Sequence, residues 1–527
     1  MKTGKQILSD FFDTFDIEYV FGNPGTTETT FLDVVSSHKK CKFILALHES
    51  VATGVAAGYA LKSGKTAVVN IHTYPGLANA MSNMFNAYTT GIPMLVVAGQ
   101  QNRKHLIHKP ILSGNLIELA KTATQVQYEV SDIDDLSVAL QRTYLEASES
   151  KVPTFLSIPM EIYKDESSIS YFKNTKLLTD TQITDLSPII NEIKQHNGKK
   201  IAFVADAEAI WSSKLKCSLL ELSVNLDSDV YLAPFSGHTA VDVNTPNYKG
   251  ILPAISLDAN NILANYEMVI LLGEKIQSFL FHEKPTIPQS VVLVQFSNGN
   301  VRTNFDCPFD YVVRGNIGEN LTLLSEELGC KKVNLTKQES RKINHDTLLV
   351  KMLDYLPRDS AVVIEGSSHQ GVEEKIAELL KFSEVYYEPR GGALGMAMPL
   401  AVGVSLYSKK HSICLVGDGG SMYSIHSLWT AAHYKIPVIF ICFVNHEYHI
   451  LKQLWKLQVP DSNEQDYASI MDITNPELNL HKIAEGFGAK VANASNENYE
   501  EILKLALEFN GPTFITIADD HKYEFGG

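Results

Sequence analysis

The stretch CLVGDGGSMYS, residues 414–424, runs from apolar side chains directly into an aspartate held between glycines. An apolar run bounded by glycine predicts a buried strand that ends in a tight turn. The flanking glycines would let backbone amides approach a phosphate, and Asp418 would offer a hard oxygen to a divalent cation. Because Gly-Asp-Gly is also ordinary turn chemistry, the stretch alone leaves both interpretations open.

The next apolar run, VIFICFVN, ends at Asn445, 27 residues after Asp418. That spacing fits one strand–helix–strand unit, so both side chains would lie at the same edge of a parallel sheet. Mg²⁺ takes few protein ligands and shares its remaining positions with phosphate oxygens and water. Asp418, Asn445 and a carbonyl near Glu447 would therefore suffice as its protein ligands.

Similar β-rich runs alternate with segments of helical length along all 527 residues. This alternation predicts an α/β fold of doubly wound parallel sheets, and the chain is too long for a single core. Polar segments near 165–185 and 331–345 offer no sustained apolar face, so we predict that they are linkers. We therefore expect three domains, at residues 1–170, 185–332 and 343–527.

The first and last thirds of the chain resemble each other. SGKTAVVNIH at 63 pairs with KKHSICLVGD at 409, GIPMLVVAGQ at 91 with KIPVIFICFVN at 435, and VPTFLSIP at 152 with GPTFITIAD at 511. Three pairs in the same order favour duplication over a chance similarity of buried strands. His72 and Asp418 would then occupy equivalent places at strand ends, where open α/β sheets bind ligands.

Composition limits the classes of partner and the cellular compartment that we expect for the protein. The net charge of -15 argues against nucleic acid or an anionic membrane surface as a partner. The six cysteines are scattered without a CxxC pair, which favours reduced thiols over disulfides or a zinc site. The N-terminal stretch MKTGKQILSDFFDTF lacks the core of a signal peptide, and no apolar run approaches membrane-spanning length. We therefore expect a cytoplasmic protein.

The GDG turn followed by Asn445 resembles the cofactor signature of thiamine diphosphate enzymes. The segments YVFGNPGTTE, ILALHES, NIHTYPGLANAM, RGGALGMAMP and SLWTAAHYKIP resemble further parts of that family, in family order. The likeness covers nearly the whole chain, more weakly in its middle third, and is strongest to the 2-oxo acid decarboxylases that include benzoylformate decarboxylase. It implies two related outer domains that bind the pyrimidine and diphosphate ends of thiamine diphosphate, with Mg²⁺, and a central domain between them.

The resemblance also implies roles for individual residues. Glu49 would hydrogen-bond the aminopyrimidine and favour its imino tautomer, whereas without the resemblance it is equally an acid that complements a helix dipole. Leu394 would hold the cofactor bent, and the Gly392 carbonyl would meet the 4′-amino group. The other implied cofactor contacts are Gly25, Asn79, Ser367, Ser368, Gly419, Ser421 and Tyr448.

Histidines would handle the substrate. A lone histidine is more often structural, but the resemblance implies that His72 transfers protons after decarboxylation. His282 matches a second family histidine, although its spacing from Gly273 is two residues longer than the family pattern. Thr26 stands where the family has a serine that contacts the substrate carboxylate.

The chain departs from the family pattern after the second ligand. Val444 precedes Asn445 where the family usually shows two asparagines, and the following HEYHILKQLW is bulkier and more charged than expected. His446, Glu447 and His449 would reshape or recharge the pocket there. Two further residues match positions that line the substrate side chain, and neither is the residue expected in an aromatic acceptor site: Ile450 and Leu454.

These features predict non-oxidative decarboxylation of a 2-oxo acid to an aldehyde, through a thiazolium ylid and an enamine. The first alternative is a carboligase or synthase, similar to acetolactate synthase, which joins the decarboxylated donor to a carbonyl acceptor. His72 favours decarboxylation, because a proton donor quenches the carbanion that ligation needs. The second alternative is a non-catalytic homologue or a dinucleotide-binding protein, but no GxGxxG follows a strand and opens a helix.

The sequence leaves open whether the central domain carries FAD, as acetolactate synthases do. Family members build each active site from the pyrimidine domain of one subunit and the diphosphate domain of another. The resemblance therefore implies a homodimer as the minimum, and we expect a homotetramer formed as a dimer of dimers. The substrate would be a small 2-oxo acid.

Overall fold

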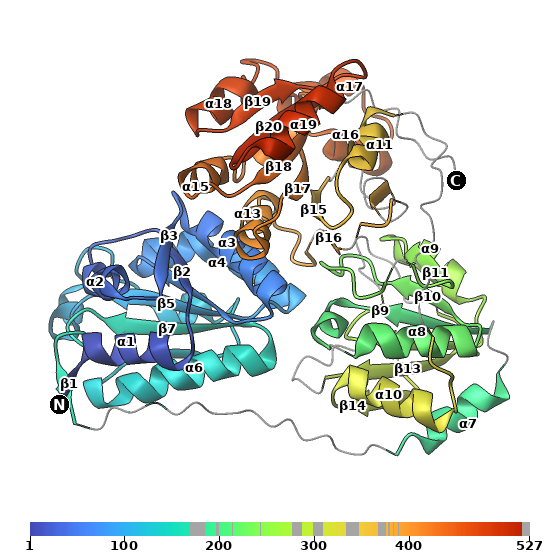
Figure 1. Ribbon diagram of the computed structural model, residues 1–527, viewed down its shortest axis with the longest axis horizontal. Coiled ribbons are helices and arrows are strands. Elements are labelled where there is room, and N and C mark those ends of the chain that lie inside the picture. Colours follow the sequence, from blue (N-terminus) through green and yellow to red (C-terminus); the bar gives the residue numbers. More distant parts are fainter. Residues whose placement is uncertain are drawn as a thin grey trace. The chain divides into compact units, whose positions relative to one another are not determined.

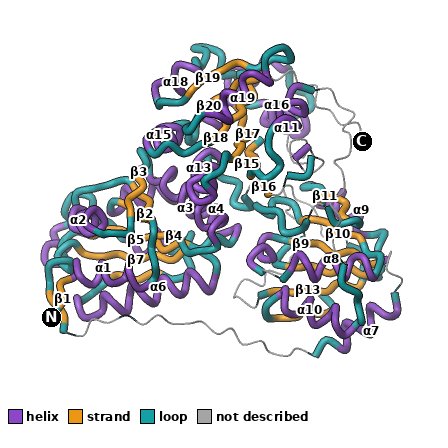
Figure 2. Tube along the Cα trace, in the orientation of Figure 1, coloured by secondary structure: helices purple, strands orange, loops and turns teal. Residues whose placement is uncertain are grey.

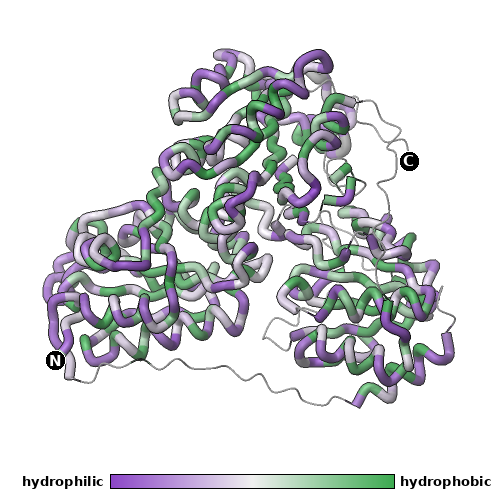
Figure 3. Tube along the Cα trace, in the orientation of Figure 1, coloured by the Kyte–Doolittle hydropathy of each residue, from purple (hydrophilic) through white to green (hydrophobic). Residues whose placement is uncertain are grey.

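The computed structural model describes most of the chain, and every statement below concerns these residues: 1–168, 172, 185–196, 200–212, 214–242, 244–276, 287–298, 309–333, 347–366, 376–377, 380–382, 384–387 and 389–518. Three parallel sheets dominate the fold, each flanked by helices (Figures 1 and 2), as the sequence predicts. Hydrophobic residues follow the strands, while hydrophilic residues predominate on the outer helices (Figure 3).

The chain divides into two compact units. The first, which we call unit 1, comprises Met1–Lys176, Asp346–Glu373 and Gly391–Gly527, and the second, unit 2, comprises Leu177–His345 and Glu374–Arg390. Unit 1 thus contains both outer sheets, and unit 2 contains the central one. The three domain boundaries expected from the sequence stay predictions.

The first sheet of unit 1 has the strand order β3-β2-β4-β5-β7-β6 and is parallel throughout. A short antiparallel pair joins β1 to β8 beside it. The central strands are apolar and buried on both faces, as parallel sheets require. The strands are β1 (Lys2–Thr3), β2 (Tyr19–Gly22), β3 (Lys42–Leu45), β4 (Ala67–Ile71), β5 (Met94–Gln100), β6 (Gln127–Glu129), β7 (Pro153–Pro159) and β8 (Glu166–Ser167).

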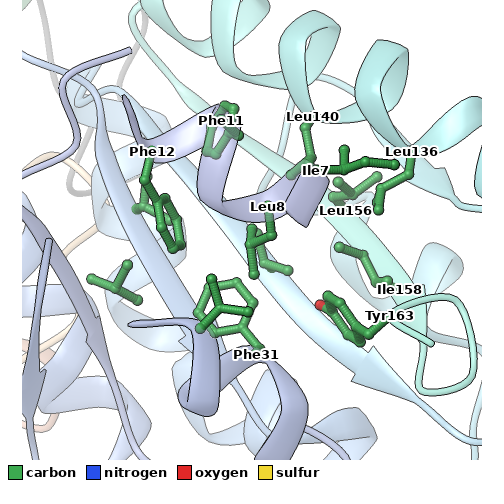
Figure 4. Packing of buried hydrophobic residues seen from close by; sticks show 14 of the residues in the cluster. Ile7, Leu8, Phe11, Phe12, Phe31, Leu136, Leu140, Leu156, Ile158 and Tyr163 are labelled. Carbon is green, nitrogen blue, oxygen red and sulfur yellow. The ribbon is translucent and has the colours of Figure 1, made fainter. Parts of the chain in front are cut away.

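Helices cover this sheet and form its main core on one face. They are α1 (Gly4–Thr14), α2 (Thr29–Ser37), α3 (Glu49–Ser63), α4 (Thr73–Thr90), α5 (Leu116–Ala120) and α6 (Leu136–Ser150), with 3₁₀ turns at Arg103–His108 and Ile133–Asp135. Phe11 and Phe12 of α1, Phe31 of α2 and Leu140 of α6 belong to one buried cluster with β7 (Figure 4). The apolar residues of α1 recur at helical spacing, which explains why it buries one face here.

The second sheet of unit 1 repeats the topology of the first. Its strands β15, β17, β18, β20 and β19 follow one another in the order of β2, β4, β5, β7 and β6. The predicted duplication is therefore confirmed, and β4 corresponds to β17, so His72 and Asp418 occupy equivalent places. The strands are β15 (Ala361–Glu365), β17 (Ser412–Gly417), β18 (Val438–Val444), β19 (Lys490–Asn493) and β20 (Pro512–Ala518).

Two of the described helices that accompany the second sheet, α16 (His449–Gln458) and α17 (Glu464–Met471), are formed by the segment that follows Asn445. The other described helices are α11 (Leu348–Tyr355), α13 (Ala397–Ser408), α14 (Asp418–Ser421), α15 (Ser427–His433), α18 (Leu480–Gly486) and α19 (Tyr499–Glu508).

Helices α3 and α13 lie side by side and join the two sheets of unit 1 (Figure 1). Both are apolar on all sides and almost wholly buried, which is typical of a central helix. A Cβ on Gly58 would lie 2.0 Å from the carbonyl oxygen of Leu400, and one on Gly403 would lie 2.0 Å from that of Val55. The two backbones can approach this closely only because both positions are glycine.

Unit 2 holds the third sheet, with strand order β11-β10-β9-β12-β13-β14. Its strands are β9 (Ile201–Ala205), β10 (Asp229–Leu232), β11 (Tyr248–Ile251), β12 (Met268–Leu272), β13 (Val292–Ser297) and β14 (Tyr311–Arg314), and its helices are α7 (Ser187–Gln195), α8 (Leu215–Asn225), α9 (Ser256–Leu263) and α10 (Ile317–Glu327), with a 3₁₀ turn at Ala207–Trp211. Unit 2 also includes β16 (Glu384–Tyr386), which is not a strand of this sheet, and its Val385 accepts a backbone hydrogen bond from Thr239 (3.1 Å).

Candidate active site

Glu49 begins α3 directly after the loop that leaves β3. The His48 side chain caps this helix by accepting a hydrogen bond from the Ser50 amide (3.2 Å). The Glu49 carboxylate is buried, with only 6% of the residue exposed, and accepts a hydrogen bond from Asn79 Nδ2 (3.1 Å). A Cβ at Gly76 would lie 2.9 Å from its Oε1, so glycine leaves room for the acid. Glu49 and Asn79 are thus brought together, as expected of one site.

His72 directly follows β4 and precedes α4, and a buried acid fixes its ring. Its Nδ1 lies 2.7 Å from Oε2 of Glu28, which is 1% exposed. Glu28 Oε1 also accepts hydrogen bonds from Thr27 Oγ1 (2.5 Å) and from the Gly99 amide (2.9 Å). Sequence reasoning missed Glu28, although the acid at the end of NPGTTE is visible in the segment that carries Gly25.

The acids around His72 raise its pKa. The hydrogen bond to Glu28 raises the pKa of His72 above its usual value, and it outweighs the opposing effect of partial burial. The negative charges of Glu28 and Glu49 act in the same direction. A Cβ on Gly25 would overlap the His72 ring, so this predicted cofactor residue also shapes the space around the histidine.

Asp418 stands at the carboxyl end of β17 and organises the turn there. Its Oδ1 accepts a hydrogen bond from the Gly419 amide (2.7 Å), and its Oδ2 accepts from the amides of Asn445 (3.1 Å) and His446 (2.7 Å). The residue is 3% exposed. Burial raises the pKa of Asp418, while the three amides oppose that rise. The structure therefore brings Asp418 and Asn445 to the same sheet edge, as their spacing predicts.

The remaining predicted residues of this edge lie around Asp418. Ser421 Oγ donates a hydrogen bond to the Asp418 carbonyl (2.7 Å), and the Tyr448 ring packs against Gly419. The side-chain oxygen of Asn445 accepts a hydrogen bond from the Glu447 amide (3.1 Å).

The charges that follow Asn445 pair with one another. Glu447 accepts a hydrogen bond from His449 Nδ1 (2.6 Å) and forms an ion pair with the buried Lys452, which also pairs with Asp472. Burial alone would raise the pKa of Glu447, but the bonds from Lys452 and His449 outweigh it and lower that pKa. The Glu447 side chain is therefore engaged within the protein, so the nearby carbonyl remains the predicted metal ligand. Ile450 and Leu454 lie half-buried on α16 beyond this cluster.

The loop before α13 carries Gly392 and Leu394. Gly392 has a φ of 67°, in the left-handed region that favours glycine, and Leu394 is half-buried. The buried carboxylate of Glu365, at the end of β15, accepts hydrogen bonds from the three backbone amides that follow Leu394. Burial raises the pKa of Glu365, while those amides oppose the rise.

Other predicted residues stand apart from these groups. Thr26 is exposed, and its neighbour Thr27 is the residue that contacts His72, at 3.2 Å. Three predicted residues lie outside the described part of the chain: His282, Ser367 and Ser368. Within the described residues, no group of three or more histidine, cysteine, aspartate or glutamate side chains could hold a metal ion. The described cysteines, which exclude Cys307, are free thiols.

Comparison with known proteins defines the class of this fold and site. The model of the thiamine pyrophosphate enzyme N-terminal TPP binding domain matches residues 2–119, and that of the C-terminal TPP binding domain matches residues 368–517. The two matches fall on the two related sheets of unit 1, and the second one contains Asp418 and Asn445. The chain belongs to the thiamine pyrophosphate enzymes.

Individual relatives extend the likeness over nearly the whole chain. Benzoylformate decarboxylase of Pseudomonas aeruginosa is 26% identical, covering 98% of this chain and 99% of that protein. The acetolactate synthase large subunit of Haemophilus influenzae is 24% identical, covering 96% of this chain and 92% of its own. In fold, the 4-hydroxybenzoylformate decarboxylase of Rhodococcus jostii superposes with a TM-score of 0.85 at 22% identity, covering 99% of this chain and 100% of that one.

The residues present fit the family's cofactor and a hard cation. A buried carboxylate at Asp418 and an amide oxygen at Asn445 supply the oxygen ligands that Mg²⁺ prefers. A Cβ added to Gly417 would meet no atom within 4 Å, so the backbone at the end of β17 borders open space. A diphosphate could approach the strand end there, as it does at other glycine-rich turns.

Among the described residues, none of the helices combines the length and the apolar character that a membrane crossing requires.

Proposed function

We propose that this chain catalyses the non-oxidative decarboxylation of a 2-oxo acid to an aldehyde, with thiamine diphosphate and Mg²⁺. The observation that carries the proposal is the pairing of His72 with the buried Glu28. The negative charge of Glu49 also acts on this histidine and raises its pKa. A histidine whose proton is stabilised at a sheet edge that binds ligands is suited to deliver that proton to a product carbon. Proton delivery ends a decarboxylation with release of an aldehyde.

Thiamine diphosphate, when bound, supplies the nucleophilic carbon and the electron sink for loss of CO₂. Glu49 would hold the aminopyrimidine by a hydrogen bond and exchange a proton with it. Asn79, which donates to Glu49 Oε2, would fix the carboxylate in that orientation. Leu394 would press against the cofactor, and the Gly392 carbonyl would accept a hydrogen bond from the cofactor's 4′-amino group.

Asp418 and Asn445 would hold Mg²⁺, with the carbonyl near Glu447 as the third protein ligand. The amides that converge on Asp418 keep its Oδ2 oriented toward the 445–446 turn. Gly419, Ser421 and Tyr448 would line the diphosphate. Each cofactor would lie between two copies of the chain, so we propose a homodimer as the minimum and a homotetramer as the complete assembly.

A carboligase is the second candidate, because acetolactate synthases match this chain over nearly its whole length. In that reaction the donor carbon attacks a second carbonyl before it is protonated. The positioned proton on His72 disfavours this outcome. Ile450 and Leu454 match family positions that line the substrate side chain, and neither is the residue expected for an aromatic acceptor, so benzoylformate itself is an unfavoured substrate.

The deciding experiment is CO₂ release by the purified protein with thiamine diphosphate and Mg²⁺. Aliphatic, aromatic and acidic 2-oxo acids are supplied in turn, and the organic product is identified. An aldehyde from one class supports the proposal and defines the pocket. A hydroxyketone would assign the carboligase instead, and absence of CO₂ from every acid would contradict the decarboxylase proposal.

A further inference from the structure

Helix α4 holds the backbone of the loop that carries Leu394. Asn86 Nδ2 donates a hydrogen bond to the Ala393 carbonyl (2.7 Å), and Asn86 Oδ1 accepts one from the Ala393 amide (3.1 Å). Asn86 is 0% exposed. A Cβ on Gly391 would lie 2.4 Å from Asn86 Oδ1, so the loop presses directly on this side chain. Both hydrogen-bonding groups of one residue of the loop are thus satisfied by a single asparagine.

Glu365 holds the same loop from β15. Its Oε1 accepts a hydrogen bond from the Gly395 amide (2.9 Å), and its Oε2 accepts hydrogen bonds from the amides of Met396 (2.9 Å) and Ala397 (3.0 Å). The residue is 3% exposed. A buried carboxylate is tolerated only when hydrogen bonds compensate for its lost hydration, and here every one of them comes from the loop and the first turn of α13.

Leu394 is therefore flanked on both sides in the sequence. Asn86 fixes the residue before it, and Glu365 fixes the residue after it. Neither contact uses the Leu394 side chain, which is half-buried. Asn83 adds a longer contact from its Nδ2 to the Gly395 carbonyl (3.4 Å).

The asparagines of α4 also connect the loop to Glu49. Asn79, Asn83 and Asn86 follow each other at spacings of four and three residues, which places them on one face of the helix. Asn79 donates to Glu49, and Asn83 donates to the carbonyl of Ser50 (2.8 Å). One helix thus contacts both the acid and the loop of the same chain, which would serve two different cofactors in the proposed dimer.

We propose that Asn86 and Glu365 are positioning residues that set where Leu394 lies. This inference rests on the proposed function, in which Leu394 bends the cofactor. The plain alternative is that Glu365 only caps α13 and that Asn86 only stabilises the junction between the sheets. The two accounts differ in one respect: a purely structural role changes stability, whereas a positioning role also changes how readily the bound cofactor loses its C2 proton.

The test uses Asn86→Ala, which removes both contacts, and Asn86→Asp, which keeps the acceptor alone. Glu365→Gln keeps the size of the side chain and loses one acceptor and the charge. Leu140→Ala, in the core cluster of α6, is the matched control for loss of stability, because Leu140 lies in the cluster on the face covered by α1. If Glu365→Gln does not fold, the Asn86 variants test the opposite side of the loop independently.

The first readout is hydrogen exchange of individual amides in the full-length protein without cofactor. Asn86→Ala should speed exchange at Ala393, and Glu365→Gln should speed it at Gly395, Met396 and Ala397, each by about tenfold or more. The second readout is the rate at which bound thiamine diphosphate exchanges its C2 proton, followed by NMR. We expect Asn86→Ala and Glu365→Gln to slow it by about 10- to 100-fold, Asn86→Asp to fall between, and Leu140→Ala to leave it unchanged.

Unchanged C2 exchange in the folded Asn86 and Glu365 variants would overturn the inference, whatever happens to their stability. Slowing by Leu140→Ala equal to that of Asn86→Ala would overturn it too, because destabilisation alone would then suffice. Both readouts are independent of turnover. If the wild-type protein releases no CO₂ while the variants slow C2 exchange as expected, the decarboxylase proposal fails and the positioning inference stands.

Discussion

Glu28 and His72 are 44 residues apart in sequence, yet their side chains meet at 2.7 Å, where the end of β4 faces the start of α2. The acid is almost wholly buried, and the histidine is partly exposed. The pair therefore keeps a proton at the border between the protein interior and solvent.

Glu28→Gln should lower the pKa of His72, because the hydrogen bond to the carboxylate is the main cause of its rise. A raised pKa in the folded state stabilises the protein fully below the unfolded value of about 6.5, and this contribution is lost as the pH rises through the folded pKa. The wild-type advantage in unfolding free energy over Glu28→Gln should thus shrink as the pH rises above about 6.5. Urea unfolding across pH 5.5 to about 8.5, with NMR titration of His72, measures both. An advantage that grows over this range would contradict the assignment.

Glu49→Gln should abolish most turnover and leave the fold intact. Glutamine keeps an oxygen that can accept the Asn79 hydrogen bond, but it cannot exchange a proton with the aminopyrimidine. We expect kcat to fall by at least about 100-fold. Glu149→Gln, an exposed acid of α6, is the control and should retain normal kinetics. Circular dichroism checks the fold, and near-normal activity of Glu49→Gln would refute the proposed mechanism.

Asp418→Ala should weaken the retention of cofactor. The substitution removes a proposed Mg²⁺ ligand and the acceptor of three backbone amides. The dissociation constant for thiamine diphosphate in the presence of Mg²⁺ should rise by at least about tenfold, measured by calorimetry. Asp461→Ala, at an exposed position, serves for comparison. If Mg²⁺-dependent binding were unchanged in Asp418→Ala, Asp418 would not be a ligand.

Gly58→Ala should destabilise unit 1. The added methyl group would lie 2.0 Å from the Leu400 carbonyl, so α3 and α13 would have to move apart. Overpacking of this kind costs about 1–3 kcal/mol, read as a lower urea midpoint. Gly486→Ala, at the end of α18, meets no atom within 4 Å and should change stability by less than about 0.5 kcal/mol. Equal stabilities of the two variants would show that α3 and α13 are not packed this closely.

Much of the fold follows from local patterns. Strands such as β5, β7 and β18 are continuous apolar runs because they are buried on both faces, and that pattern is legible in the sequence. The edge strand β11 (Tyr248–Ile251) carries no such pattern, because YKGI contains a lysine and a glycine and none of its residues is fully buried.

The candidate site also contains some residues that the sequence could predict and others that it could not. Asp418 and Asn445 follow predicted strands, so topology alone brings them to one sheet edge. Glu28, Asn86 and Glu365 could not be found this way, because much of their bonding is to backbone groups or to residues far away in the chain. No spacing rule connects Asn86 to Ala393, 307 residues later, and a backbone partner leaves no mark on residue type.

The close packing of α3 against α13 has a consequence for synthesis. Gly58 and its partner helix are separated by about 340 residues, so the small-residue face of α3 leaves the ribosome long before α13 exists to cover it. At typical translation rates the interval is roughly 20 to 70 s. During that time the nascent N-terminal sheet exposes an apolar helix face, and a chaperone that binds such surfaces would have this interval in which to act, before α13 begins at residue 397.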